Sequence, residues 1–256
     1  MGKLIKYNFK SYYKEIIILL SLIVLANIGL FYKENKWQQL SIIVLSIVIV
    51  SFASLVTLIW NINMFSKDLY SDSSYLIFTL PISGKQILGA KLITAIIQMI
   101  LVNIVGSIFT YIHLNSLPKE FEMFTQFLNG RNFLIGLIIT IFQYISFLLT
   151  VYVSISLSRV AIRKRKLGKL GTFGIFIVIN IIFVKSTDLV QQIFSKTMNI
   201  SIKSSIFPSA SSIDLGGFTI NIPNIHVNIA STIFSILVAI GLFMVTAYLL
   251  QEKVEI

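Results

Sequence analysis

The stretch LSIIVLSIVIVSFASLVTLIW, residues Leu40–Trp60, contains no Lys, Arg, Asp or Glu. A helix needs about 20 apolar residues to cross roughly 30 Å of hydrocarbon, and this stretch is long enough. The whole chain has the same character, since 56% of its 256 residues are hydrophobic and only 12% are charged. Soluble domains carry roughly 25% charged residues, so this chain has too few polar residues to cover a water-exposed surface. We therefore expect an integral membrane protein.

Five further uncharged runs predict a total of six membrane-spanning helices. Four of them are close to the required length: Ile16–Tyr32, Leu92–Ile112, Phe133–Leu157 and Ile229–Leu250. The sixth, Leu170–Val184, is shorter and lies between Lys169 and Lys185. Either these lysines extend to the membrane surfaces, or the helix continues past Lys185. The expected fold class is an all-α polytopic membrane protein, with a six-helix transmembrane domain over residues 16–256.

The distribution of basic residues predicts the orientation, because cytoplasmic loops are rich in Lys and Arg. With the N-terminus in the cytoplasm, the 21 Lys and Arg residues divide 14 inside to 7 outside. The basic segment Arg159–Lys169 contributes most to this difference. We expect a multi-pass protein of the cell membrane with both termini in the cytoplasm. The net charge of +11 is explained by such anchoring charges, and nucleic acid is not an expected partner.

Residues 1–15 are predicted to form an amphipathic helix at the membrane surface. One face carries the basic residues Lys3, Lys6, Lys10 and Lys14. Another face carries the apolar residues Ile5, Phe9, Tyr12 and Ile16, at helical spacing. A basic helix with aromatic residues on its apolar face suits a bilayer with anionic headgroups. The same pattern also fits a simple positive anchor for the first span.

The predicted outer loop, residues 185–228, is the longest connection. Its second half alternates apolar and other residues, with Phe218, Ile220 and Ile222 on one side. A period of two favours short strands, with Gly216-Gly217 as a turn. A small folded cap is therefore expected outside the membrane.

The inner loop, residues 61–91, reads NINMFSKDLYSDSSYLIFTLPISGKQILGAK. After a polar, acid-bearing start, Ser74–Leu80 is predicted to form a short helix or turn that Pro81 closes. Ser83 lies three residues before Gln86, which is the spacing of a capping box at the start of the third span. The sequence therefore predicts a short cytoplasmic helix followed by a sharp turn into the membrane.

This loop resembles the corresponding loop of the type-2 family of ATP-binding-cassette permeases, which are mostly exporters. In that family an acidic residue, a helix and a leucine-proline-small-serine sequence precede a basic-flanked third span. The matching positions are Asp68 or Asp72, then Tyr75–Leu80, then Leu80-Pro81-Ile82-Ser83, then Lys85 through Lys91. Six spans and an N-terminal surface helix also match in outline. The chain departs from the pattern where it offers aspartate for the frequent glutamate, and at Gly84, where the family often has a bulky or basic residue.

The resemblance implies a permease subunit that pairs with a second copy or a similar permease. A separate cytoplasmic ATPase would bind ATP and Mg²⁺ and move the loop, while this chain would hold no cofactor or metal and catalyse no reaction. The absence of a G-x-x-x-x-G-K-[ST] sequence agrees with this division. The residues implied in ATPase coupling are Asp68, Asp72, Tyr75, Phe78, Leu80, Pro81 and Ser83. Amphipathic or antimicrobial peptides, or other hydrophobic compounds, are the expected cargo.

Polar residues in the predicted spans are candidates for the translocation pathway: Gln98, Asn103 and Gln143. Amides in spans more often bond a neighbouring helix, so packing is the alternative role. An ion-coupled secondary transporter is disfavoured because the predicted spans lack acids and bases, except for His113 near the outer surface. A membrane immunity or sensor subunit that does not transport stays open. No serine, carboxylate or cysteine accompanies His113 and His226 in a pattern typical of an enzyme.

Overall fold

The computed structural model describes residues 2–33, 37–70, 82–115, 130–161, 168–194, 197–200, 212–214, 219–221 and 225–253. The described helices are α1 (Gly2–Lys33), α2 (Gln39–Tyr70), α4 (Gly84–Asn115), α6 (Gly130–Ala161), α7 (Gly168–Ile193) and α8 (Ile229–Tyr248). A π-helical turn, Leu249–Lys253, continues α8. The strands are β1 (Thr197–Ile200), β2 (Ser212–Asp214), β3 (Thr219–Asn221) and β4 (Ile225–Asn228).

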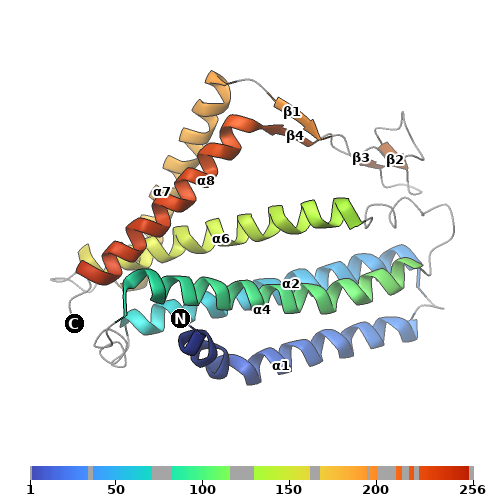
Figure 1. Ribbon diagram of the computed structural model, residues 1–256. Helices are drawn as coiled ribbons and strands as arrows, with labels where there is room; N and C mark the ends of the chain where they lie inside the picture. The colour runs from blue at the N-terminus through green and yellow to red at the C-terminus, as the bar shows by residue number, and fades with distance from the viewer. Residues whose placement is uncertain are drawn as a thin grey trace.

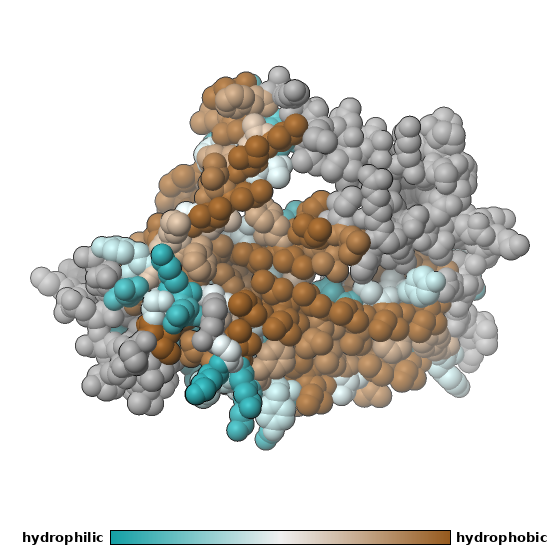
Figure 2. Space-filling view, in the orientation of Figure 1, coloured by the Kyte–Doolittle hydropathy of each residue, from teal (hydrophilic) through white to brown (hydrophobic). Residues whose placement is uncertain are grey.

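Six of the described helices are long and apolar enough to cross a membrane. Their most apolar windows have mean hydropathies between 1.9 and 2.9. Large apolar side chains lie on the outside of every helix, and hydrophobic residues dominate the surface in Figure 2. Such a surface is stable when lipid replaces water around it. The chain is therefore an all-α polytopic membrane protein, as its composition predicts.

The helices extend well beyond the predicted apolar runs. Residues 61–70 and 84–91, which we assigned to the inner loop, belong to α2 and α4. That part of the loop prediction is wrong, because polar residues at a helix end can bond protein partners and need not end the helix. Lys185 lies inside α7, so the second interpretation of the short run is confirmed and the predicted loop 185–228 begins too early.

Both termini lie toward the same end of the bundle, on the left of Figure 1. We call this the terminal end and the other the strand end. Helices α1, α2 and α4 pack side by side, α6 lies next to them, and α7 and α8 lean away from α6 toward the strand end. The main core is at the terminal end, where buried residues of α2, α4, α6 and α8 meet. The described end of α8 packs tightly on Gly84, where an added Cβ would overlap the Ala247 carbonyl oxygen.

Short antiparallel strands connect α7 with α8. Strand β1 pairs with β4, and β2 pairs with β3. Strands β3 and β4 lie where the sequence alternation predicts strands, whereas β1 lies in the first half of the predicted loop. Asn228 joins this segment to the helices, because its side chain accepts a hydrogen bond from Ser231 N at 3.0 Å and donates to Phe194 O at 2.6 Å. It thereby caps α8 and holds the end of α7 beside it.

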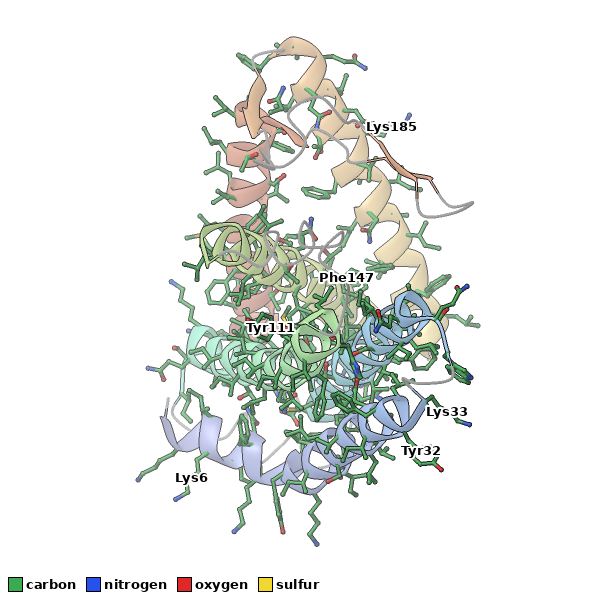
Figure 3. The ribbon with its side chains drawn as sticks, turned by 90° about the vertical axis from the view of Figure 1, so that its right-hand side faces the viewer. Lys6, Tyr32, Lys33, Tyr111, Phe147 and Lys185 are labelled. Atoms are coloured by element: carbon green, nitrogen blue, oxygen red, sulfur yellow. The ribbon has the colours of Figure 1, made fainter. Side chains whose placement is uncertain are left out.

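The N-terminal part of α1 has the two faces that the sequence predicts. All four lysines are exposed, whereas Ile5, Phe9 and Tyr12 are half-buried. The first turns are seen end-on in Figure 1 and side-on in Figure 3, where Lys6 points away from the bundle. They therefore run across the long axis of the bundle, within one continuous helix. This direction suits a helix on a membrane surface, and that placement stays a prediction.

Candidate functional site

A buried ion pair joins α2 to α4 near the terminal end. The Lys91 ammonium group contacts the Asp68 carboxylate, and Lys91 is only 2% exposed. The Asp68 side chain retains 24% exposure, so water reaches its side of the pair. A charge is costly to bury in lipid or protein unless a partner compensates it. Each of these two residues therefore depends on the other to keep its helix in place.

A separate hydrogen-bond network lies farther along the same helices, toward the middle of the bundle. The Asn61 side-chain nitrogen lies 2.9 Å from Gln98 Oε1 and 3.3 Å from the Tyr144 hydroxyl. It also donates to Thr57 O, one turn earlier on α2, at 2.8 Å. Asn61 thus connects three helices, because Gln98 belongs to α4 and Tyr144 to α6. We call Asp68, Lys91, Asn61, Gln98 and Tyr144 the polar joint.

Aromatic residues extend this connection between α2 and α6. The Phe65 and Tyr152 rings stack with centroids 4.0 Å apart, and Tyr152 donates a hydrogen bond to Asn61 O at 3.3 Å. Nearer the terminal end, the Arg159 guanidinium lies 5.5 Å from the centre of the Tyr70 ring. Stacked rings and cation–ring contacts each add stability beyond simple burial. The end of α2 is therefore fixed to α6 at several levels.

The residues implied in ATPase coupling are only partly described. Asp72, Tyr75, Phe78, Leu80 and Pro81 lie outside the described residues. Ser83 directly precedes α4, and its carbonyl oxygen accepts hydrogen bonds from Gln86 N at 2.9 Å and Ile87 N at 3.2 Å. This agrees with the predicted start of a helix at Ser83.

Asp68 lies on α2 and not in a loop, and its charge is directed at Lys91. The described geometry places it in contact with a second helix, whereas the resemblance implies an ATPase-coupling acid at Asp68 or Asp72. The statement that the spans lack acids and bases also needs correction, because both partners of the pair lie in span-forming helices.

The three pathway candidates have different surroundings. Gln98 is buried in the polar joint, so the alternative packing role applies to it. Asn103 is half-buried and lines a pocket between α2 and α4. Gln143 is exposed on α6. The structure does not bring the three together into one site.

A second polar cluster joins α1, α2 and α4 nearer the strand end. Ser46 donates to Asn27 Oδ1 at 2.8 Å and lies 3.2 Å from the Thr110 hydroxyl. His113 lies near the strand end of α4 and is buried, with its ring centre 4.2 Å from that of Phe31 of α1.

Asp68 and Gln98 were candidates from the sequence, but Asn61, Tyr144 and the pairing of Asp68 with Lys91 were not predicted, although a signal was present. Asn61, Phe65 and Asp68 follow the spacing i, i+4 and i+7, which places them on one face of a helix. Lys91 and Gln98 are also seven residues apart. Part of each stretch was predicted to be a loop, so the helix face that these residues share was not recognised.

No protein-family model, curated protein or solved structure matches this chain. A role for the site therefore rests on the arrangement of the described residues. No group of three or more His, Cys, Asp or Glu suited to a metal lies among the described residues. The charged and amide side chains of the polar joint connect α2, α4 and α6, so a displacement of one of these helices acts on the others.

Proposed function

We propose that the chain is the transmembrane permease subunit of an ATP-driven exporter, coupled to a separate cytoplasmic ABC-type ATPase. The polar joint is the observation that carries the proposal. Its ion pair, Asp68–Lys91, lies near the two helix ends, Tyr70 and Gly84, that flank the segment resembling an ATPase-contacting loop. A force on that segment acts on α2 and α4 together, because Asp68 and Lys91 bind them to each other.

The polar joint also explains how a movement at the membrane surface would reach the rest of the bundle. Asn61 bonds residues of α4 and α6, and Phe65 stacks on α6. Packed cores respond to such forces by moving as units and not by stretching. In this proposal α2, α4 and the terminal half of α6 shift together, while the helices diverge toward the strand end, where the pathway opens.

The proposal includes an orientation and a cargo. The terminal end holds the basic residues of α1 together with Lys67, Lys85 and Arg159, and the positive-inside rule assigns it to the cytoplasm. The strand segment would then lie outside the cell membrane. An apolar interior and amide side chains suit an amphipathic peptide or another hydrophobic compound. A second permease copy would complete the pathway.

Copurification tests the proposal directly. The tagged chain, purified in mild detergent from its native host, is expected to bring down a vanadate-sensitive ATPase. Tyr75→Ala and Phe78→Ala should each reduce this activity about tenfold or more, as loss of an interface anchor does. Tyr111→Ala, an exposed tyrosine on α4 toward the strand end, is the matched control. A chain that purifies without any ATPase under these conditions contradicts the proposal.

An ion-coupled secondary transporter is a second candidate, and the structure gives it a specific basis. Buried ionisable residues in spans commonly bind protons or cations, and Asp68 and Lys91 are such a pair. The two candidates differ in their energy source. Proteoliposomes that contain only this chain should transport under an imposed pH gradient if the second candidate is right, and should not if the exporter proposal is right.

A further inference from the structure

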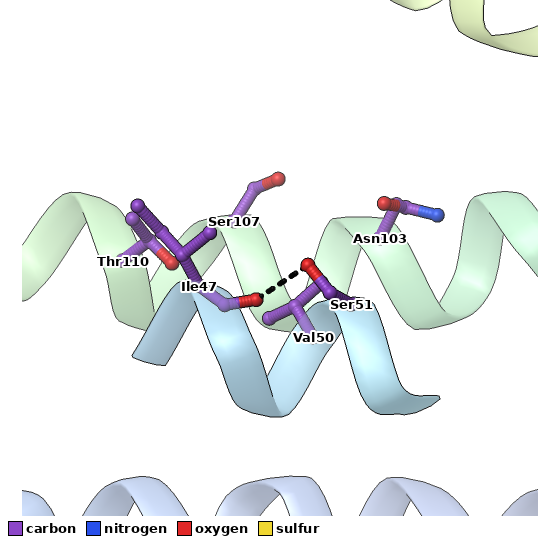
Figure 4. Close-up of a pocket in the computed structure, with 6 residues that line it drawn as sticks. All are labelled: Ile47, Val50, Ser51, Asn103, Ser107 and Thr110. Atoms are coloured by element: carbon purple, nitrogen blue, oxygen red, sulfur yellow. Dashed lines mark hydrogen bonds between the residues drawn. The ribbon is translucent and has the colours of Figure 1, made fainter. Parts of the chain in front are cut away.

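A pocket with a volume of about 250 Å³ lies between α2 and α4, on the half of the bundle nearer the strand end. Its wall consists of Ile47, Val50 and Ser51 of α2 and Asn103, Ser107 and Thr110 of α4. Figure 4 shows that Asn103 and Ser107 project to the same side of the helix pair, away from α1. The polar joint uses none of these residues, so the pocket is a separate feature.

A close approach of two helices shapes this pocket. Val50 packs directly against Gly106, where an added Cβ would overlap the valine side chain. Because Gly106 has no side chain, α2 comes near the α4 backbone and Val50 forms the floor. On either side of Gly106, the larger α4 residues Asn103 and Thr110 form part of the pocket wall.

The polar groups of the pocket carry no charge, and the Ser51 hydroxyl already donates to Ile47 O at 2.8 Å (Figure 4). Asn103, Ser107 and Thr110 share one face of α4 at the spacing i, i+4 and i+7, and Ser51 faces them from α2. Asn103 uses one amide hydrogen for Met99 O at 2.8 Å. Its side chain makes no further hydrogen bond to the described residues. A second N–H and a carbonyl oxygen are therefore available for a ligand.

These groups lie inside two helices that cross the membrane, where water is scarce. Exposed amides in hydrocarbon are costly, and polar residues of spans normally face a protein partner, a cavity or a ligand. Thr110 already has protein partners, because it donates to Gly106 O at 3.1 Å and lies 3.2 Å from the hydroxyl of Ser46, which bonds Asn27 of α1. No described helix offers Asn103 and Ser107 an equivalent partner.

We propose that this pocket binds the uncharged, hydroxyl-rich headgroup of a single-chain amphiphile. Amide and hydroxyl groups both donate and accept hydrogen bonds, as a glycerol-type headgroup does, and no charged side chain is present to attract an ion. The volume is below the roughly 300–1,000 Å³ typical of sites for whole drug-sized ligands, so it fits a headgroup.

The flanking residues suit the rest of such a ligand. Ile104 and Ile108 follow Asn103 and Ser107 directly, and they are 50% and 53% exposed. An acyl chain can therefore lie along α4 while its headgroup occupies the pocket. The proposal goes beyond the exporter function, because this binding needs no ATPase and would occur in the isolated chain.

Photocrosslinking tests the proposal on the full chain in phosphatidylcholine nanodiscs. The probe is a monoacylglycerol with a diazirine in its acyl chain, and mass spectrometry locates the crosslinks. We expect crosslinks on α2 and α4 beside the pocket. Excess monooleoylglycerol should reduce them at least fivefold, whereas lysophosphatidic acid and oleylamine, with similar chains but charged headgroups, should leave them nearly unchanged.

Variants separate the pocket from the general membrane surface. Asn103→Leu and Ser107→Ala should each lower crosslinking about fivefold. Asn180→Leu is the matched control, because Asn180 makes the same local bond, to Phe176 O at 2.8 Å, on α7. Equal competition by the three lipids, or full crosslinking in both pocket variants, overturns the proposal. Crosslinking that falls as more chains occupy each nanodisc would assign the pocket to a second copy and also overturn it. An exporter without this site would keep its ATPase, so the two proposals fail independently.

Discussion

The two halves of α6 have very different surroundings. From Leu148 to Ser158 nearly every side chain is buried among other helices. Between Leu134 and Gln143, by contrast, the described side chains are half-buried or exposed. Both halves are similarly apolar and free of acidic residues. The helix is therefore held firmly at the terminal end and has few neighbours toward the strand end.

This contrast shows where α6 is held by its neighbours and where few described residues surround it. The polar joint, the Phe65–Tyr152 stack and the Gly84–Ala247 contact all lie toward the terminal end. The pocket at Asn103 and the divergence of α7 and α8 lie toward the other end. Substitutions at the first set should destabilise the fold, whereas substitutions at the second set should leave it intact.

The largest effect is expected at the ion pair. Asp68→Asn leaves the Lys91 charge almost completely buried without a partner, and should lower the free energy of unfolding by about 3–5 kcal/mol. Lys91→Met should cost less, because water reaches part of Asp68. Unfolding by dodecyl sulfate in dodecyl maltoside micelles measures both changes.

A matched control and a double variant make the ion-pair test specific. Lys85→Met, on the exposed face of α4, should change stability by less than about 0.5 kcal/mol. Combining Asp68→Asn with Lys91→Met should recover most of the loss, because it removes both charges. A double variant less stable than Asp68→Asn alone would show that the pair does not hold the helices together.

A smaller effect is expected from close helix packing at the terminal end. Gly84→Ala forces a methyl group against the Ala247 backbone, which cannot rotate away, and should cost about 1–3 kcal/mol. Gly241→Ala on α8 and Gly136→Ala in the exposed half of α6 meet nothing within 4 Å. They should be neutral or slightly stabilising in the same unfolding assay. Equal losses at Gly84 and Gly136 would contradict the contrast between the two ends.

The smallest expected change in stability concerns two amide residues of α4, Gln98 and Asn103. Gln98→Leu removes an acceptor of Asn61 and should cost about 0.6 kcal/mol, the average for hydrogen bonds between membrane helices, and at most about 1.7 kcal/mol. Asn103→Leu loses only a bond within its own helix, so its stability should stay near that of the parent chain. The thermal-unfolding temperatures of the two purified variants measure this difference in stability. Greater damage from Asn103→Leu would make Asn103 a packing residue and weaken its assignment to the pocket.

The sequence by itself determined the membrane fold and the number of long apolar helices. Stretches such as Leu40–Trp60 are decisive, because a hydrocarbon layer demands both length and freedom from charge. The two faces of residues 1–15 and the helix start at Ser83 also follow from local rules of spacing and capping. In each case one segment contains all the information that the prediction needs.

Only the tertiary structure decided which faces turn inward. Lipid tails are as apolar as a protein core, so the buried Leu148 and the exposed Ile138 look alike in the sequence. The partner of Lys91 was equally hidden, because Lys91 lies 23 positions after Asp68 and meets it only when α2 and α4 pack together. The Asn103 pocket likewise exists because Gly106 brings two distant segments into contact. Pairings across helices depend on the packed bundle, and a single segment does not contain them.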